Sequence, residues 1–213
     1  MATDDRQGFR PARHLGGGMI RSKRYPVAGS GAFHGVAIGH AVRFNPNGEG
    51  VMPVSGNVTP VTPGLGVVVA CYDSNNKPFT FSQPTRGPAI PPTATATDPT
   101  IVGFVDVIDD PNVSFIVQAD ATVISNHIGQ FVAVTAANGD YNTAAGTSKM
   151  QLQMSSVDTS VKMFQIVGYA PDEQTALGTL MGAGAGQGQT NANVEVVFAA
   201  HARKGSVGTA VAG

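Results

Sequence analysis

The chain has 213 residues, of which 42% are hydrophobic and only 13% are charged, whereas an average soluble domain has about 25% charged residues. This length can build a sizeable core without disulfides, and a single cysteine, Cys71, excludes an internal disulfide framework. The net charge of −1 argues against a broadly basic nucleic-acid-binding body, and no apolar run approaches the roughly 18 residues of a membrane span.

Residues 1–33 are predicted to form a flexible, basic N-terminal arm. The segment lacks a periodic apolar pattern and contains glycine-rich stretches at 16–18 and 29–31, which are costly to order. Residues 1–25 hold six basic and two acidic side chains, whereas the remaining chain holds seven basic and twelve acidic ones. We expect the basic side chains to bind an acidic protein surface, which could belong to a second copy of the chain. They are Arg6, Arg10, Arg13, Arg21, Lys23 and Arg24.

Residues 34–202 are predicted to form a β-rich body. Apolar side chains alternate with small or polar ones from residue 35 to 44, which is the pattern of a half-buried strand, and the sequence then turns at 45–48. Many short strands separated by Gly, Pro, Asn and Asp predict an antiparallel barrel or sandwich. The further strands are expected at 51–54, 57–62, 65–72, 78–82, 101–108, 112–119, 130–135, 149–155, 162–170 and 193–202.

Three segments depart from this strand pattern. Residues 84–100 contain five prolines, so they are either an exposed excursion or a linker between two subdomains. One short helix is predicted over 121–128, with Asp120 as its N-cap, Gly129 after its end, and Ile124 and Ile128 on its buried face. Residues 203–213 are expected to be a flexible C-terminal tail.

Residues able to carry chemistry do not form a recognisable site. The aspartates at 106, 109, 110 and 120 are best explained as solvated turn residues, with a cation site or a catalytic role as the weaker alternatives. No two of the five histidines are spaced four residues apart, and Cys71 lies in an apolar run typical of a core thiol. We therefore predict no enzyme activity, no metal and no cofactor.

The segment from Val102 to Gly129 resembles a segment of small structural proteins of tailed bacteriophages. In both, a strand leads to a turn of sequence Asp109-Asp110-Pro111-Asn112, then to a strand ending in Gln118-Ala119-Asp120, a short helix and a glycine. Weaker matches extend the resemblance over roughly residues 65–202. They lie at 145–152, 164–168 and 193–198.

The resemblance implies a capsid decoration, or cement, protein. Such a protein is β-rich, often a homotrimer, assembled in the host cytoplasm, and bound in the virion to the outer surface of the shell, where it bridges major capsid subunits. No catalytic residue is implied.

Three other functions remain open. A receptor- or carbohydrate-binding fibre or adhesion component should expose aromatic side chains, yet the chain has no Trp and is only 7% aromatic. A small enzyme would need a convergent polar pocket, and an internal nucleic-acid-associated protein would use the basic arm on phosphates. We prefer a protein partner for the arm, because the body has no basic face by composition.

Overall fold

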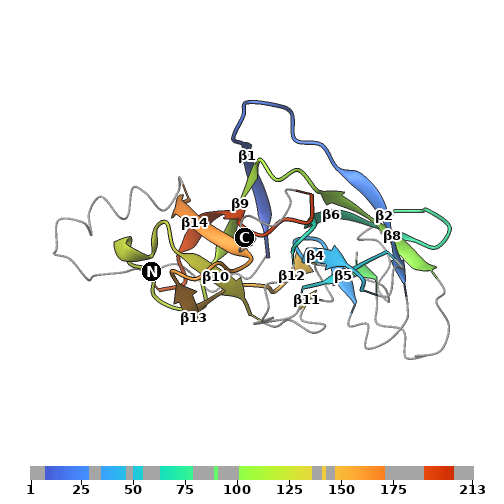
Figure 1. The fold of residues 1–213 in the computed structure, drawn as a ribbon. Helices are drawn as coiled ribbons and strands as arrows, with labels where there is room; N and C mark the ends of the chain where they lie inside the picture. The colour runs from blue at the N-terminus through green and yellow to red at the C-terminus, as the bar shows by residue number, and fades with distance from the viewer. Residues whose placement is uncertain are drawn as a thin grey trace, which may run out of the picture.

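The computed structural model describes residues 8–28, 35–46, 50–54, 63–78, 89–90, 101–135, 141–142, 147–170 and 190–203. The predicted mostly β fold is confirmed, because the described strands pair mainly into two antiparallel sheets of six and five strands. Figure 1 shows the two sheets in neighbouring halves of a sandwich-like body, with β9, β10, β13 and β14 in one half and β2, β4, β5, β6 and β8 in the other.

The six-stranded sheet curls so that its strands enclose a core. A bridge between Ala119 and Leu152 joins the end of β9 to the start of β13, although the two strands are four places apart in the sheet. The side-chain amide of Gln151 donates to Gln118 Oε1 across the same contact, at 3.0 Å. In sheet order, the strands are β1 (Arg10–His14), β9 (Val113–Gln118), β15 (Asn193–Phe198), β14 (Phe164–Tyr169), β10 (Phe131–Val134) and β13 (Leu152–Asp158).

The five-stranded sheet curls in the same way, because a bridge between Val27 and Gly50 brings its two outer strands together. Gly50 has φ +77°, and a Cβ there would collide with the carbonyl of Pro26, so this closure requires glycine. The strands, in sheet order, are β2 (Lys23–Ala28), β8 (Ile101–Ile108), β6 (Gly66–Asp73), β4 (Ala41–Phe44) and β5 (Val51–Pro53). Two short pairs accompany the sheets: β3 (Val36–Ala37) with β7 (Ala89–Ile90), and β11 (Tyr141–Asn142) with β12 (Thr147–Ser148).

Aromatic rings pack where the two sheets meet. Phe9 stacks on Phe164 with ring centroids 4.7 Å apart, and Phe164 contacts Phe198 at 4.5 Å. Gly64 then pairs with the C-terminal segment through two backbone hydrogen bonds, from its own N–H to the Ala200 carbonyl and from the Ala202 N–H to its carbonyl. The two halves therefore form one body with a continuous core across the junction.

Two connections between the sheets lie side by side. The turn after β8 leads directly into β9, and the loop between β1 and β2 makes the opposite crossing beside it. The possible subdivision at 84–100 is contradicted, because the strands before and after it, β6 and β8, pair with each other in one sheet. Within that segment only residues 89–90 are described.

The prediction of a flexible arm over 1–33 is wrong for residues 8–28. Strand β1 pairs with β9 and strand β2 pairs with β8, so each is the outer strand of a different sheet. Phe9, Tyr25 and Val27 are buried. The physical reason is that these few apolar side chains fill gaps in cores built by distant strands, so the apolar pattern within the segment is too sparse to predict two strands. Residues 1–7 and 29–33 of the predicted arm lie outside the described ranges.

Other predicted elements match in part. The strand expected at 35–44 is broken between β3 and β4, because Gly39 adopts φ +85°. The helix expected at 121–128 is a single 3-10 turn, η1 (Ser125–His127), and Ile128 is exposed. Asp120 does not cap it, since its carboxylate accepts the Met154 N–H at 2.8 Å and so ties β9 to β13.

The prediction of a flexible C-terminal tail over 203–213 is wrong for Arg203, which forms an ion pair with Asp109. The strand expected at 57–62, residues 79–82 of the strand expected at 78–82, and residues 204–213 of the expected tail lie outside the described part of the chain.

Candidate interaction surface

The six basic residues predicted to bind a partner do not form one free patch. Arg13 makes a two-point contact with Glu195, from Nε at 2.8 Å and from its terminal nitrogen at 3.1 Å. Arg24 binds Asp106 with the same two distances, and its guanidinium lies 3.7 Å from the centre of the Tyr72 ring. Two of the six are therefore occupied within the chain.

The other four basic residues differ in their surroundings. Arg10, Arg21 and Lys23 are exposed, and the Lys23 ammonium lies 5.6 Å from the centre of the Tyr25 ring. Arg6 lies outside the described residues. The expected complementarity between a basic arm and an acidic body is thus partly satisfied inside the molecule. As one consequence, the Arg24 guanidinium holds the pKa of Asp106 below its usual value.

Partly buried polar groups hold the crossing between the sheets together. The Tyr25 hydroxyl donates to Asp109, and Arg203 contacts both, with its terminal nitrogen 2.8 Å from the carboxylate and 2.6 Å from the hydroxyl. Burial and the hydrogen bond to Asp109 raise the pKa of Tyr25 to about 12. The expectation of a solvated acid is wrong here, because β2 and the C-terminal segment cover the Asp109 side chain, which is only 12% exposed.

His14 fixes the beginning of the loop that follows β1. Its Nδ1 accepts the N–H groups of Gly16 and Gly18, at 3.1 and 3.0 Å, so the ring proton is on Nε2 and is donated to Asp110 at 3.1 Å. The Asp110 carboxylate also accepts the Asn112 N–H, which is the main cause of its lowered pKa. These contacts tie the loop to the turn between β8 and β9.

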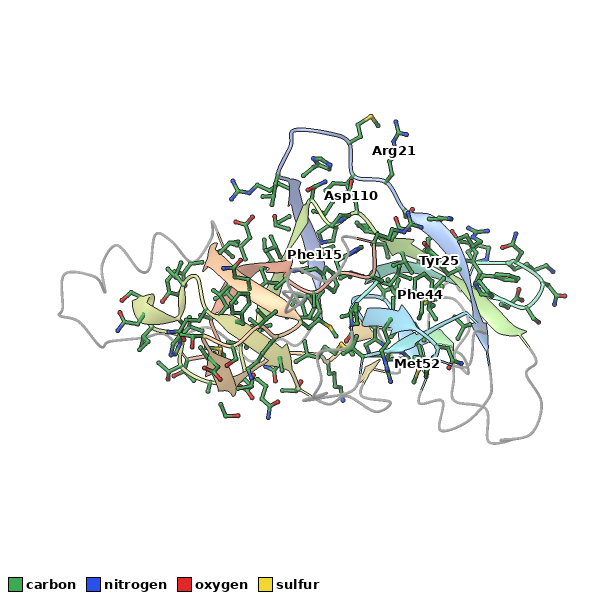
Figure 2. The ribbon with its side chains drawn as sticks, viewed as in Figure 1. Arg21, Tyr25, Phe44, Met52, Asp110 and Phe115 are labelled. Atoms are coloured by element: carbon green, nitrogen blue, oxygen red, sulfur yellow. The ribbon has the colours of Figure 1, made fainter. Side chains whose placement is uncertain are left out.

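We call residues 15–22, which join β1 to β2, the arch. All eight are exposed, including three large apolar side chains: Leu15 at 53%, Met19 at 77% and Ile20 at 37%. The arch rises above both sheets in Figure 1, and Figure 2 shows Arg21 projecting from it, away from the body. It therefore presents apolar and cationic groups together to solvent.

The remaining candidate residues serve packing within the described ranges. Cys71 is buried, with its Sγ 3.8 Å from the Val36 carbonyl, and His40 is buried and accepts the Ala37 N–H. The described residues contain no group of three or more His, Cys, Asp or Glu able to hold a metal ion. Among them, too, no helix is long and apolar enough to cross a membrane.

No protein-family model, no curated protein and no solved structure matches this chain. The arch and the Tyr25–Asp109–Arg203 contacts were not anticipated from the sequence. The alternation of Tyr25 with Val27 was the available signal for β2, and Pro26 between them is a residue that sheets accept mainly in outer strands. For the arch, the signal was an apolar pair, Met19-Ile20, placed directly after three glycines.

Proposed function

We propose that this chain is a structural protein of a tailed-phage virion. In this proposal it has no enzymatic activity, binds the outer surface of the capsid shell as a homotrimer, and bridges neighbouring major capsid subunits. Each subunit of the trimer would engage the shell separately, and the high effective concentration of linked subunits would turn weak contacts into stable attachment.

The observation that carries the proposal is where the resembling segment lies in the fold. Residues 102–129 contain all of β8 except its first residue, together with β9 and η1, and they include the turn that joins the two sheets. β8 lies between β2 and β6, and β9 lies between β1 and β15. The likeness to decoration proteins therefore concerns the centre of the body rather than a peripheral loop.

The electrostatics of the body also support a binding role. Glu195 and Asp106, two of the acids on the strands, are neutralised by arginines of the same chain. Docking such a surface against another protein requires little removal of water from free ions, which favours extensive contact.

Co-sedimentation tests the proposal. The purified chain is mixed with DNA-free shells made from the major capsid protein encoded in the same genome, and shells of an unrelated phage serve as the control. We expect saturable binding with a fixed stoichiometry to the cognate shells alone. A chain that stays in the supernatant at micromolar concentration would refute the proposed function.

Sedimentation equilibrium of the free chain tests the trimer separately. A mass of three chains at micromolar concentration is expected. A monomer that nevertheless binds shells would remove the trimer while leaving the shell-binding role intact.

A further inference from the structure

We propose that the arch is the element that docks on the shell, with Met19 and Ile20 entering an apolar depression on the major capsid protein that has acidic groups at its rim. This inference rests on the proposed function and specifies the surface that performs it.

The first support is that the arch leaves apolar side chains in water. Within six residues it presents Leu15, Met19 and Ile20, and Met19, at 77%, is the most exposed of the large hydrophobic side chains in the described part of the chain. Single exposed apolar residues are common on protein surfaces, but a cluster on one protruding loop is typical of a binding site. Met also adapts its shape readily to an apolar partner surface.

The second support is that the arch is held in place although its own side chains bury little. His14 Nδ1 accepts two of its N–H groups, and the Leu15 N–H donates to the Asn112 carbonyl at 2.8 Å. The arch therefore begins on the turn that joins the two sheets and ends on β2, which is paired with β8. A loop ordered before binding loses less conformational entropy on docking, so its apolar contacts contribute more to affinity.

The third support is the charge left over for a partner. Arg13 and Arg24 are bound to Glu195 and Asp106, whereas Arg21 meets no carboxylate among the described residues. A partner with an acidic rim complements Arg21 while accepting the apolar side chains beside it. Nucleic acid fits this surface less well, because two of the basic side chains are already neutralised and apolar groups do not bind phosphates.

Matched double variants test the arch in the shell co-sedimentation assay. Met19→Ser with Ile20→Ser removes the two apolar side chains, and Arg21 stays in place. The control is Ile128→Ser with Val167→Ser, which removes one exposed apolar side chain from the turn after η1 and one from β14, next to the contact between the Gly129 N–H and the Ile166 carbonyl. Thermal unfolding of both variants establishes that the body is intact.

We expect the arch variant to bind cognate shells about 10- to 100-fold more weakly, as for the loss of one or two central interface side chains, and the control to bind within about 3-fold of the unchanged chain. If the unchanged chain binds and both variants bind equally well, the arch inference is wrong and the proposed function stands. If the unchanged chain does not bind shells at all, both fall together.

Arg21→Gln separates the protein partner from a nucleic-acid one. We expect weaker shell binding at low salt, a smaller loss of affinity as salt is raised, and no change in binding to a DNA duplex. Loss of DNA binding with unchanged shell binding would instead assign the arch to nucleic acid and overturn the inference.

Discussion

Replacing Phe9 by alanine tests whether the N-terminal segment belongs to the core. Phe9 is only 2% exposed, and its ring stacks on Phe164 with an interplanar angle of 23°. Its N–H donates to the Gly39 carbonyl at 2.9 Å, so the backbone beside β1 is fastened at the junction of the two sheets. The substitution removes the ring and leaves this backbone contact available.

The expected loss of stability follows from the burial of the Phe9 side chain. Truncating a fully buried phenylalanine to alanine destabilises proteins by about 3–5 kcal/mol, because transfer energy is lost and a cavity remains. For a chain of this size, each kcal/mol lowers the melting temperature by about 2–4 °C, so we expect a decrease of about 6–20 °C.

Circular dichroism during thermal and urea unfolding measures this loss, and Leu15→Ala is the control. Leu15 lies only six positions away, yet it is half exposed on the arch, so its truncation should change the free energy of unfolding by no more than about 0.5 kcal/mol. The urea midpoint of the Phe9 variant should fall while the slope stays constant. Equal, small effects of both substitutions would mean that residues 8–14 are a flexible appendage, and the placement of β1 would then be wrong.

Three further substitutions test other contacts. Gly50→Ala should lower the free energy of unfolding, measured in urea, by about 1–3 kcal/mol more than Gly17→Ala does. Both glycines have positive φ, but only a Cβ at Gly50 meets the backbone of Pro26. Equal losses would contradict the contact between β2 and β5. Because the folded pKa of Tyr25 is about 12, above its ordinary value of 10.0, its stabilising contribution is complete below pH 10 and declines as the pH rises toward 12. Tyr25→Phe should therefore flatten the alkaline fall in melting temperature, and curves of equal steepness would count against the buried hydroxyl. The pKa of Asp106 is lowered, so its contribution is complete above its ordinary value of 3.8 and is lost as the pH falls through the lower folded value. Asp106→Asn should lower the melting temperature at pH 7 and weaken its dependence on acid, and an unchanged acid profile would argue against the pairing with Arg24.

The positions of most strands could be predicted from the sequence. The strand expected at 101–108 is β8, and the one expected at 112–119 contains β9, because alternating apolar residues bounded by Asp, Asn and Pro determine both the strand and its ends. The turn at Asp109-Asp110-Pro111-Asn112 was predicted for the same local reason. Alternation is a property of a few consecutive residues, so it can be read without knowing which strands pair.

The predictions from sequence failed where a local conformational preference competes with a contact to a residue distant in the chain. Asp120 is well placed by sequence to cap a helix, but its carboxylate accepts the Met154 N–H from β13 instead. A helix over 121–128 would have to bury Ile124 and Ile128, yet the buried side chain in this stretch is Val123. Tertiary packing therefore limited the helix to a single 3-10 turn. The local preference for a capped helix amounts to about 1 kcal/mol, and the contacts with the sheet outweigh it.

The sequence alone determined the β class, the buried Cys71 and the imbalance of charge between residues 1–25 and the remainder. Only the tertiary structure decided where those basic residues lie. Arg13 and Arg24 face Glu195 and Asp106, which are 182 and 82 residues away in the chain, so no local pattern could pair them. A strand's own residues specify which face is buried, whereas its partner is chosen by the shape and charge of the whole sheet. For that reason a segment that looked like a free arm became the outer strands of two sheets.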